Sequence, residues 1–141
     1  MLQRKMLDTL RRWKQSKQRE CLLVKGARQV GKSYIIEKFG SEEYENLIVV
    51  DFIKMPDAKE AFEGELTADG IFSRLSLLMP GTRFVPGETL LFLDEIQECP
   101  QARTALKYLA LDDRIDVIAS GSLLGIAYRE QSTSVPVGYE R

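Results

Sequence analysis

The stretch GARQVGKS at residues 26–33 decides the fold of this sequence. It fits the pattern G-x-x-x-x-G-K-[ST], and it stands between the apolar run CLLVK at 21–25 and a segment with helical spacing. A strand, a glycine-rich loop and a helix in this order are typical of a phosphate-binding loop, because backbone amides can close around a phosphate and the helix adds its positive end. Every residue of this Walker A loop is therefore a candidate nucleotide contact: Gly26, Ala27, Arg28, Gln29, Val30, Gly31, Lys32 and Ser33. Lys32 can reach the β- and γ-phosphates as a catalytic cation, and the Ser33 hydroxyl can bind Mg²⁺.

The rest of the sequence continues the alternation of strand and helix that this loop begins. Further apolar runs of strand length lie at 47–52, 89–93 and 115–119. Segments with apolar residues at helical spacing lie between the runs, at 32–39, 69–79 and 101–110. We expect Gly40 in the connection after the first of these helices and Pro100 at the start of the last. The pattern predicts an α/β fold in which helices cover both faces of a parallel sheet, a three-layer α/β/α sandwich.

Two carboxylates follow directly on the run at 89–93, in the position of a Walker B motif. Asp94 comes first and is predicted to hold the metal ion with Ser33, largely through water. Glu95 points differently from the strand end, so we expect it to orient or deprotonate an attacking water, as an ATPase requires. The structural alternative is that Glu95 only caps the turn before Pro100.

Small polar residues follow the run at 115–119. In P-loop ATPases with an inserted central strand, a polar residue at the end of that strand senses the γ-phosphate through a hydrogen bond. Ser120 is the predicted sensor, with Ser122 as the second choice. An ordinary polar strand end is the alternative, because small polar residues are common there.

Composition excludes several other classes of protein. The 141 residues, 44% hydrophobic and with a net charge of −1, suit a single domain, and no run approaches the roughly 20 apolar residues that span a bilayer. We therefore expect a cytoplasmic protein without a membrane partner. There is no histidine, which excludes Ser-His-Asp and Cys-His nucleophiles and histidine metal sites. Cys21 and Cys99 lack metal-ligand spacing and belong to opposite edges of the predicted sheet, so no disulfide is expected between them.

The first 19 residues differ in charge from the rest of the chain. They contain seven basic residues and one acidic residue, and their apolar residues recur at helical spacing: Leu2, Met6, Leu10 and Trp13. We therefore divide the chain into a basic amphipathic helix at 1–19 and a P-loop core at 20–141. The helix is interpreted as packed on the core with a solvated basic side. Nucleic-acid binding by this side stays open as an accessory role.

In these motifs the sequence resembles the N-terminal ATPase domain of a group of bacterial and archaeal AAA-type P-loop proteins that usually carry a C-terminal domain of unknown function. The matching segments run along the whole chain: GARQVGKS at 26–33, VDFIKMPDAKEAFEG at 50–64, FLDEIQECP at 92–100, ASGSLLG at 119–125 and SVPVGY at 134–139. The resemblance implies an AAA-like fold that binds ATP and Mg²⁺ and hydrolyses ATP. It assigns these roles by motif position to Lys32, Ser33, Asp94 and Glu95. Gln97, Pro136 and Gly138 are also family-like, without a role that the sequence supplies.

The chain departs from this family at its end. Such domains have a fifth strand after the sensor strand, so we expect this chain to be truncated before the last core strand. The family also has an arginine, late in the domain, that acts on the site of a neighbouring subunit. Arg129 is the only late arginine of this sequence with room to be that residue. The expected partners are ATP and either a second copy or a C-terminal domain. The leading interpretation is Mg²⁺-dependent ATP hydrolysis, and the alternative is an ATP-binding switch without turnover of its own. Two other P-loop functions are disfavoured. The sequence has no arginine-rich lid, which weighs against phosphotransfer to a small molecule, and no Asn-Lys-x-Asp run, which weighs against a GTPase.

Overall fold

The computed structural model describes residues 2–16, 20–26 and 31–122. The α-helices are α1 (Leu2–Gln15), α2 (Lys32–Glu43), α3 (Ala68–Leu78) and α4 (Pro100–Leu111). The strands are β1 (Leu22–Gly26), β2 (Asn46–Asp51), β3 (Thr89–Asp94) and β4 (Asp116–Ser122). Two short 3₁₀ helices complete the set, η1 (Pro56–Phe62) and η2 (Ile96–Glu98).

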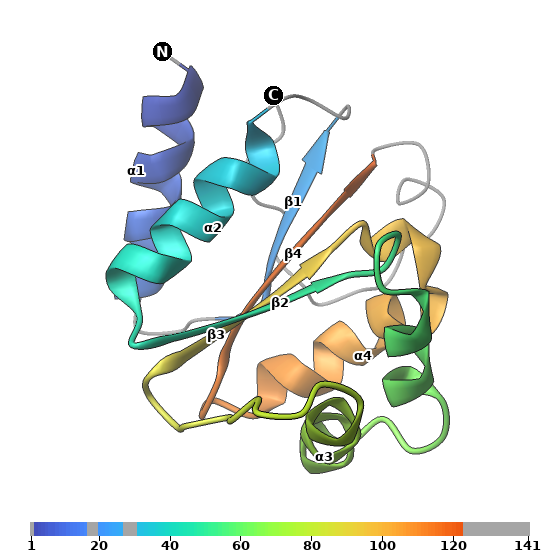
Figure 1. The fold of residues 1–141 in the computed structure, drawn as a ribbon. Coiled ribbons are helices and arrows are strands. Elements are labelled where there is room, and N and C mark those ends of the chain that lie inside the picture. Colours follow the sequence, from blue (N-terminus) through green and yellow to red (C-terminus); the bar gives the residue numbers. More distant parts are fainter. Residues whose placement is uncertain (1, 17–19, 27–30, 123–141) are drawn as a thin grey trace.

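The four strands form one parallel sheet in the order β1-β4-β3-β2. β4, the last strand among the described residues, is thus inserted between the strand that leads into the glycine-rich loop and the strand that ends at Asp94 (Figure 1). Because all strands run the same way, their carboxyl ends meet at one edge, where open α/β sheets bind their ligands. The ends of β1, β3 and β4 all lie at this edge.

Helices cover both faces of the sheet, as the apolar runs predicted. α1 and α2 lie on one face, and α3 and α4 lie on the other with η1 (Figure 1). Alternate residues of a strand serve the two cores, since successive side chains point to opposite faces. In β3, Leu90 and Phe92 pack on the α1–α2 side, whereas Leu91 and Leu93 pack on the α3–α4 side. All six residues of this strand are buried.

The first helix is part of one of these cores. Met6, Leu10 and Trp13 are buried and share a cluster with Ile36 and Phe39 of α2. The indole Nε1 of Trp13 donates a hydrogen bond to the Glu20 carbonyl at 2.6 Å. The apolar spacing of the first residues therefore marks a packed helix, with its basic residues Arg4, Lys5, Arg11 and Arg12 exposed.

Two parts of the chain differ from the sequence-based expectation. The prediction that α2 ends before Gly40 is wrong, because the helix runs on to Glu43 with Gly40 buried inside it. A Cβ at Gly40 would lie 2.7 Å from Leu47 Cδ1 and 2.9 Å from Leu90 Cδ2, so the glycine permits a close approach of helix and sheet. The 3₁₀ helix η1 was not expected at all, and it buries Phe62 in the α3–α4 core.

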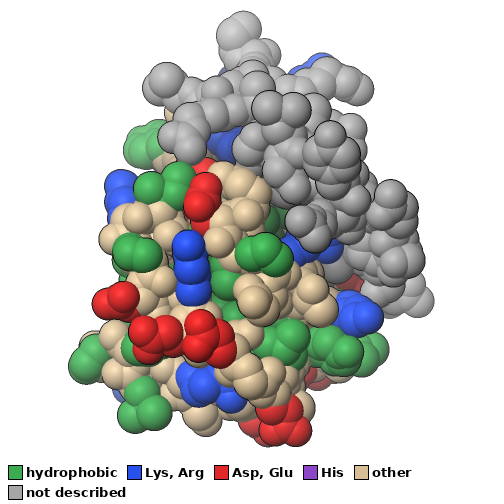
Figure 2. Space-filling model, turned by 90° about the vertical axis from the view of Figure 1, so that its right-hand side faces the viewer, with side chains coloured by type: hydrophobic (Ala, Val, Ile, Leu, Met, Phe, Trp, Pro, Cys, Tyr) green, Lys and Arg blue, Asp and Glu red, His purple; other side chains and the backbone are tan. Residues whose placement is uncertain are grey.

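Figure 2 shows acidic, basic and apolar side chains interspersed over the described part of one face. Within the described part of the chain, no helix has the length and apolar character needed to cross a membrane.

Candidate nucleotide-binding site

The glycine-rich loop enters α2 through a residue that needs unusual backbone angles. Gly31 has φ 99° and ψ −14°, a left-handed conformation that costs glycine little, and its carbonyl accepts the Ile35 amide at 2.9 Å. Lys32 and Ser33 then form the first turn of α2, where amide groups lack partners within the helix. The predicted contacts Ala27, Arg28, Gln29 and Val30 lie outside the described residues.

Asp94 and Ser33 meet at the centre of the carboxyl edge. The Ser33 hydroxyl donates a hydrogen bond of 2.7 Å to Asp94 Oδ2, across 61 positions of sequence. The Glu95 amide donates to Asp94 Oδ1 at 2.9 Å, and the Ser120 hydroxyl donates to the same oxygen at 3.3 Å. Three donors from three segments therefore surround one carboxylate.

Burial dominates the electrostatics of this carboxylate. Asp94 is 5% exposed, and loss of solvent raises its pKa above the ordinary value of 3.8, against the opposing effect of the Ser33 hydrogen bond. The neighbouring charges of Glu95 and Asp51 raise the pKa further. Asp51 stands beside Asp94 because it is the partner of Asp94 in the register of β2 and β3. A buried carboxylate with acidic neighbours is a place where a bound cation would be favourable.

Glu95 has a strained backbone. Its φ of 58° and ψ of 47° make it the one non-glycine residue with positive φ among those described. The turn that follows is anchored by Ile96, which is fully buried, and the Glu98 amide donates to the Glu95 carbonyl at 3.0 Å. The left-handed backbone at Glu95 thus forms the turn from the end of β3 into η2.

Gln97 holds the side chain of Glu95. Its Nε2 donates a hydrogen bond of 2.9 Å to Glu95 Oε1. From the sequence alone, Gln97 was family-like and had no role. The sequence gives no signal for this contact, because it depends on a left-handed backbone at Glu95 that no glycine marks.

The remaining predicted residues lie on β4 and at its neighbours. Lys32 Nζ donates to the Gly121 carbonyl at 3.4 Å, which places the ammonium at the carboxyl end of β4. Ser120 is fully buried within the strand rather than following it, because β4 continues past Ala119 to Ser122. Ser122 pairs with Gly26 in the register of β1 and β4, at the level where the glycine-rich loop begins. Arg129 lies outside the described residues.

The family model of an AAA domain matches residues 18–140. The chain belongs to this family of AAA domains. Its parallel sheet with an inserted β4 is accordingly that of an AAA-like P-loop NTPase, as the sequence predicted. No curated protein shows significant similarity to the chain. Among solved structures, PCH-2 from C. elegans is similar with a TM-score of 0.45 and 13% identity, over 99% of this chain and 40% of that chain.

The oxygen ligands available at this site fit Mg²⁺ better than they fit a metal ion that is held by protein side chains only. Among the described residues, no three Asp, Glu or Cys side chains converge as a ligand cage. Mg²⁺ keeps several waters and takes only one or two protein oxygens beside substrate phosphates. The Ser33 hydroxyl and the Asp94 carboxylate, 2.7 Å apart at the start of α2, match this requirement.

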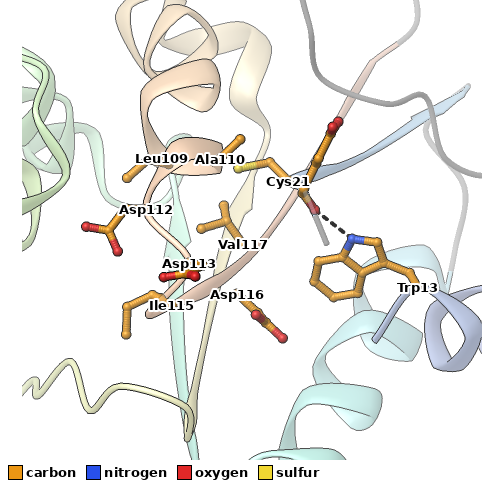
Figure 3. A pocket seen from close by; sticks show the side chains of 10 residues that line it. Trp13, Cys21, Leu109, Ala110, Asp112, Asp113, Ile115, Asp116 and Val117 are labelled. Carbon is orange, nitrogen blue, oxygen red and sulfur yellow. Dashed lines mark hydrogen bonds between the residues drawn. The ribbon is translucent and has the colours of Figure 1, made fainter. Parts of the chain in front are cut away.

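A separate pocket of the AAA domain lies at the opposite, amino edge of the sheet (Figure 3). It has a volume of about 170 Å³, and its walls are Trp13, the end of α4 and the start of β4. Two of its acidic side chains accept hydrogen bonds: Asp112 accepts from Arg114, and Asp116 accepts from the Tyr44 hydroxyl at 2.6 Å. The first contact lies in the connection between α4 and β4, and the second joins the end of α2 to β4, so we assign the pocket a structural role.

Both cysteines are buried and free. Burial raises the pKa of the Cys21 thiol to about 12, and its Sγ donates to the Leu106 carbonyl at 3.3 Å. Burial also raises the pKa of Cys99. Neither thiol is a nucleophile at neutral pH, since the reactive form is the thiolate.

Proposed function

We propose that this AAA domain binds ATP with Mg²⁺ at the carboxyl edge of its sheet and hydrolyses it. The observation that supports this most is the 2.7 Å hydrogen bond between Ser33 and Asp94. It joins the first turn of α2 to the end of β3, and thereby unites the two motifs that the sequence analysis assigned to phosphate and metal.

The residues of the glycine-rich loop and α2 bind the triphosphate in this proposal. Gly31 and the first amides of α2 direct N–H groups and the positive end of the helix toward the phosphates. Lys32 leaves the Gly121 carbonyl for the β- and γ-phosphate oxygens, a stronger partner for an ammonium. Because the lysine side chain is flexible, this exchange needs only a small movement and costs little free energy.

Ser33 and Asp94 hold the metal ion in the proposal, Ser33 directly and Asp94 largely through water. An ion held by these two residues would supply positive charge that offsets the negative charge developing on the phosphate oxygens. Asp94 needs the cation, because burial and the neighbouring Glu95 and Asp51 disfavour its negative charge. Binding of the cation and ionisation of Asp94 therefore favour each other.

Glu95 is the proposed general base. Its carboxylate accepts a proton from a water molecule while the water oxygen bonds to the γ-phosphorus and the bond to the β–γ bridging oxygen breaks, which gives ADP and phosphate. The left-handed backbone at Glu95 and the hydrogen bond from Gln97 fix the direction of this carboxylate. Strain retained at one residue is common where function requires a set geometry.

The experiment that tests the proposal compares Glu95→Gln with the parent chain. We expect the variant to bind MgATP with the parent affinity, measured by calorimetry, and to release phosphate about 10²- to 10⁴-fold more slowly, because only the base is removed. Glu98→Gln is the matched control: the same change at an exposed residue of the same turn should alter neither quantity.

Three results would separate the candidate functions. Binding with turnover lost in Glu95→Gln supports the ATPase. Binding without turnover in the parent supports the ATP-binding switch instead. Equal turnover in parent and Glu95→Gln would remove Glu95 from the mechanism.

A further inference from the structure

Ser120 lies deeper in the sheet than a phosphate sensor should. It is fully buried in β4, and two further residues of the strand, ending at Ser122, separate it from the strand's carboxyl end. Its partner in β1 is Val24, whereas Gly26, where the loop begins, is the partner of Ser122. The register therefore puts Ser122, not Ser120, at the level of the phosphate-binding loop.

The contact that Ser120 makes is with Asp94. Leu93 and Ala119 are partners across β3 and β4, so Asp94 and Ser120 are next in line on neighbouring strands. Both side chains point to the α1–α2 face, like Phe92 and Ile118 two positions before them. The Ser120 hydroxyl donates to Asp94 Oδ1 at 3.3 Å.

The two oxygens of Asp94 are held by different groups. Oδ2 accepts from Ser33, the residue proposed to bind the metal. Oδ1 accepts from the Glu95 amide and from Ser120, neither of which has a metal-binding role in the proposed function. Ser120 thus fixes one oxygen in a way that does not depend on the metal, and this leaves Oδ2 on the side of Ser33.

We propose that Ser120 is a positioning residue that orients the Asp94 carboxylate for the metal ion and does not contact the terminal phosphate. The inference rests on the proposed function, since it assigns Ser120 a place in the same site. It leaves the sensor position at the end of β4 to Ser122.

The test separates coupling to the metal from recognition of the γ-phosphate. Dissociation constants of ATP and ADP are measured for the parent and Ser120→Ala, each with Mg²⁺ and with EDTA. We expect the gain in ATP affinity that Mg²⁺ provides to fall about three- to tenfold in Ser120→Ala. This effect is small for the loss of a hydrogen bond to a charged group, because the donor–acceptor distance of 3.3 Å is long. The ratio of ATP to ADP affinity should stay unchanged.

Two further variants serve as controls. Ser76→Ala removes a hydroxyl that bonds a backbone carbonyl in α3, far from the site, and should leave all four constants unchanged. Ser122→Ala should lower the ATP to ADP ratio and leave the gain from Mg²⁺ intact. If Ser120→Ala does not fold, Ser120→Cys is used in its place in the same measurements, because cysteine has a similar volume and is a weaker hydrogen-bond donor.

A second readout needs no nucleotide. A double-mutant cycle of Ser120→Ala and Asp94→Ala, followed by urea unfolding in EDTA, should show a coupling between the two positions, because each single variant removes the same contact. The inference would be overturned if the effects of the two substitutions on the free energy of unfolding were additive. It would also be overturned if Ser120→Ala lowered the ratio of ATP to ADP affinity and left the gain in affinity from Mg²⁺ unchanged. Absence of MgATP binding by the parent overturns the proposed function, and then the cycle alone reports whether Ser120 and Asp94 interact.

Discussion

Replacement of Asp94 by asparagine should make the nucleotide-free protein more stable at neutral pH. The side chain is 5% exposed, and burial, Glu95 and Asp51 all disfavour its charge. Asparagine keeps the hydrogen-bond geometry: its oxygen still accepts from the Glu95 amide and Ser120, and its NH₂ group faces the Ser33 hydroxyl, which can accept as well as donate. Only the cost of the buried charge is removed.

The size of the effect follows from that comparison. Removing an uncompensated buried charge while retaining its hydrogen bonds gives a gain on the order of 1 kcal/mol in the free energy of unfolding at pH 7. For a chain of this length the gain raises Tm by about 3 °C.

The gain should depend on pH in a defined direction. Because the pKa of Asp94 is raised on folding, the folded parent takes up a proton more readily than the unfolded parent, and the parent gains stability as pH falls through the folded pKa toward the ordinary value of 3.8. The advantage of Asp94→Asn over the parent is therefore full above the folded pKa and shrinks as pH falls through that window.

Urea unfolding in EDTA at pH 7 and at pH 4 measures this difference. Asp8→Asn, an exposed change on α1, is the control and should shift stability by at most a few tenths of a kcal/mol. The reasoning is refuted if Asp94→Asn is less stable than the parent at pH 7, or if its advantage is the same at both pH values.

Two further predictions concern the base and the first helix. Gln97→Met removes the donor to Glu95 Oε1 with little change in size; phosphate release should slow about three- to tenfold at unchanged MgATP affinity, and no further slowing should occur in the Glu95→Gln background. A faster Gln97→Met variant would instead mean that the hydrogen bond restrains Glu95. Leu10→Ala should lower the free energy of unfolding by about 2–4 kcal/mol in urea titrations, because Leu10 is 1% exposed in the α1–α2 core; a change below about 0.5 kcal/mol would show that α1 is not part of the folding unit.

Much of the fold could be predicted from local pattern. The apolar runs and turn residues predicted the positions of the four strands. The interpretation of Ser120 as a sensor implied a strand inserted between the two motif strands, and β4 occupies that place. Gly40 was misread because a glycine in sequence looks the same whether it ends a helix or lets one approach a sheet. Only the contacts with Leu47 and Leu90 distinguish the two cases.

The candidate site was predictable in residue type and less so in depth. Lys32, Ser33 and Asp94 come together because motif spacing and parallel topology require it. The depth of Ser120 depends on how far β4 continues, and the polar residues after 119 gave no sign that the strand runs to Ser122. The contact of Gln97 with Glu95 depends on the left-handed backbone at Glu95, which the sequence does not announce because glycine is absent there.

The central claim is that ATP binds with Mg²⁺ at the start of α2, and isothermal titration calorimetry of MgATP into Lys32→Ala tests it most directly. Lys38→Ala, an exposed position of the same helix, is the matched control. The account predicts binding by the parent and by Lys38→Ala, and a loss of about 10- to 100-fold in affinity for Lys32→Ala, since a charge-assisted contact with the phosphates is removed. Binding of MgATP to Lys32→Ala with the parent affinity would contradict it.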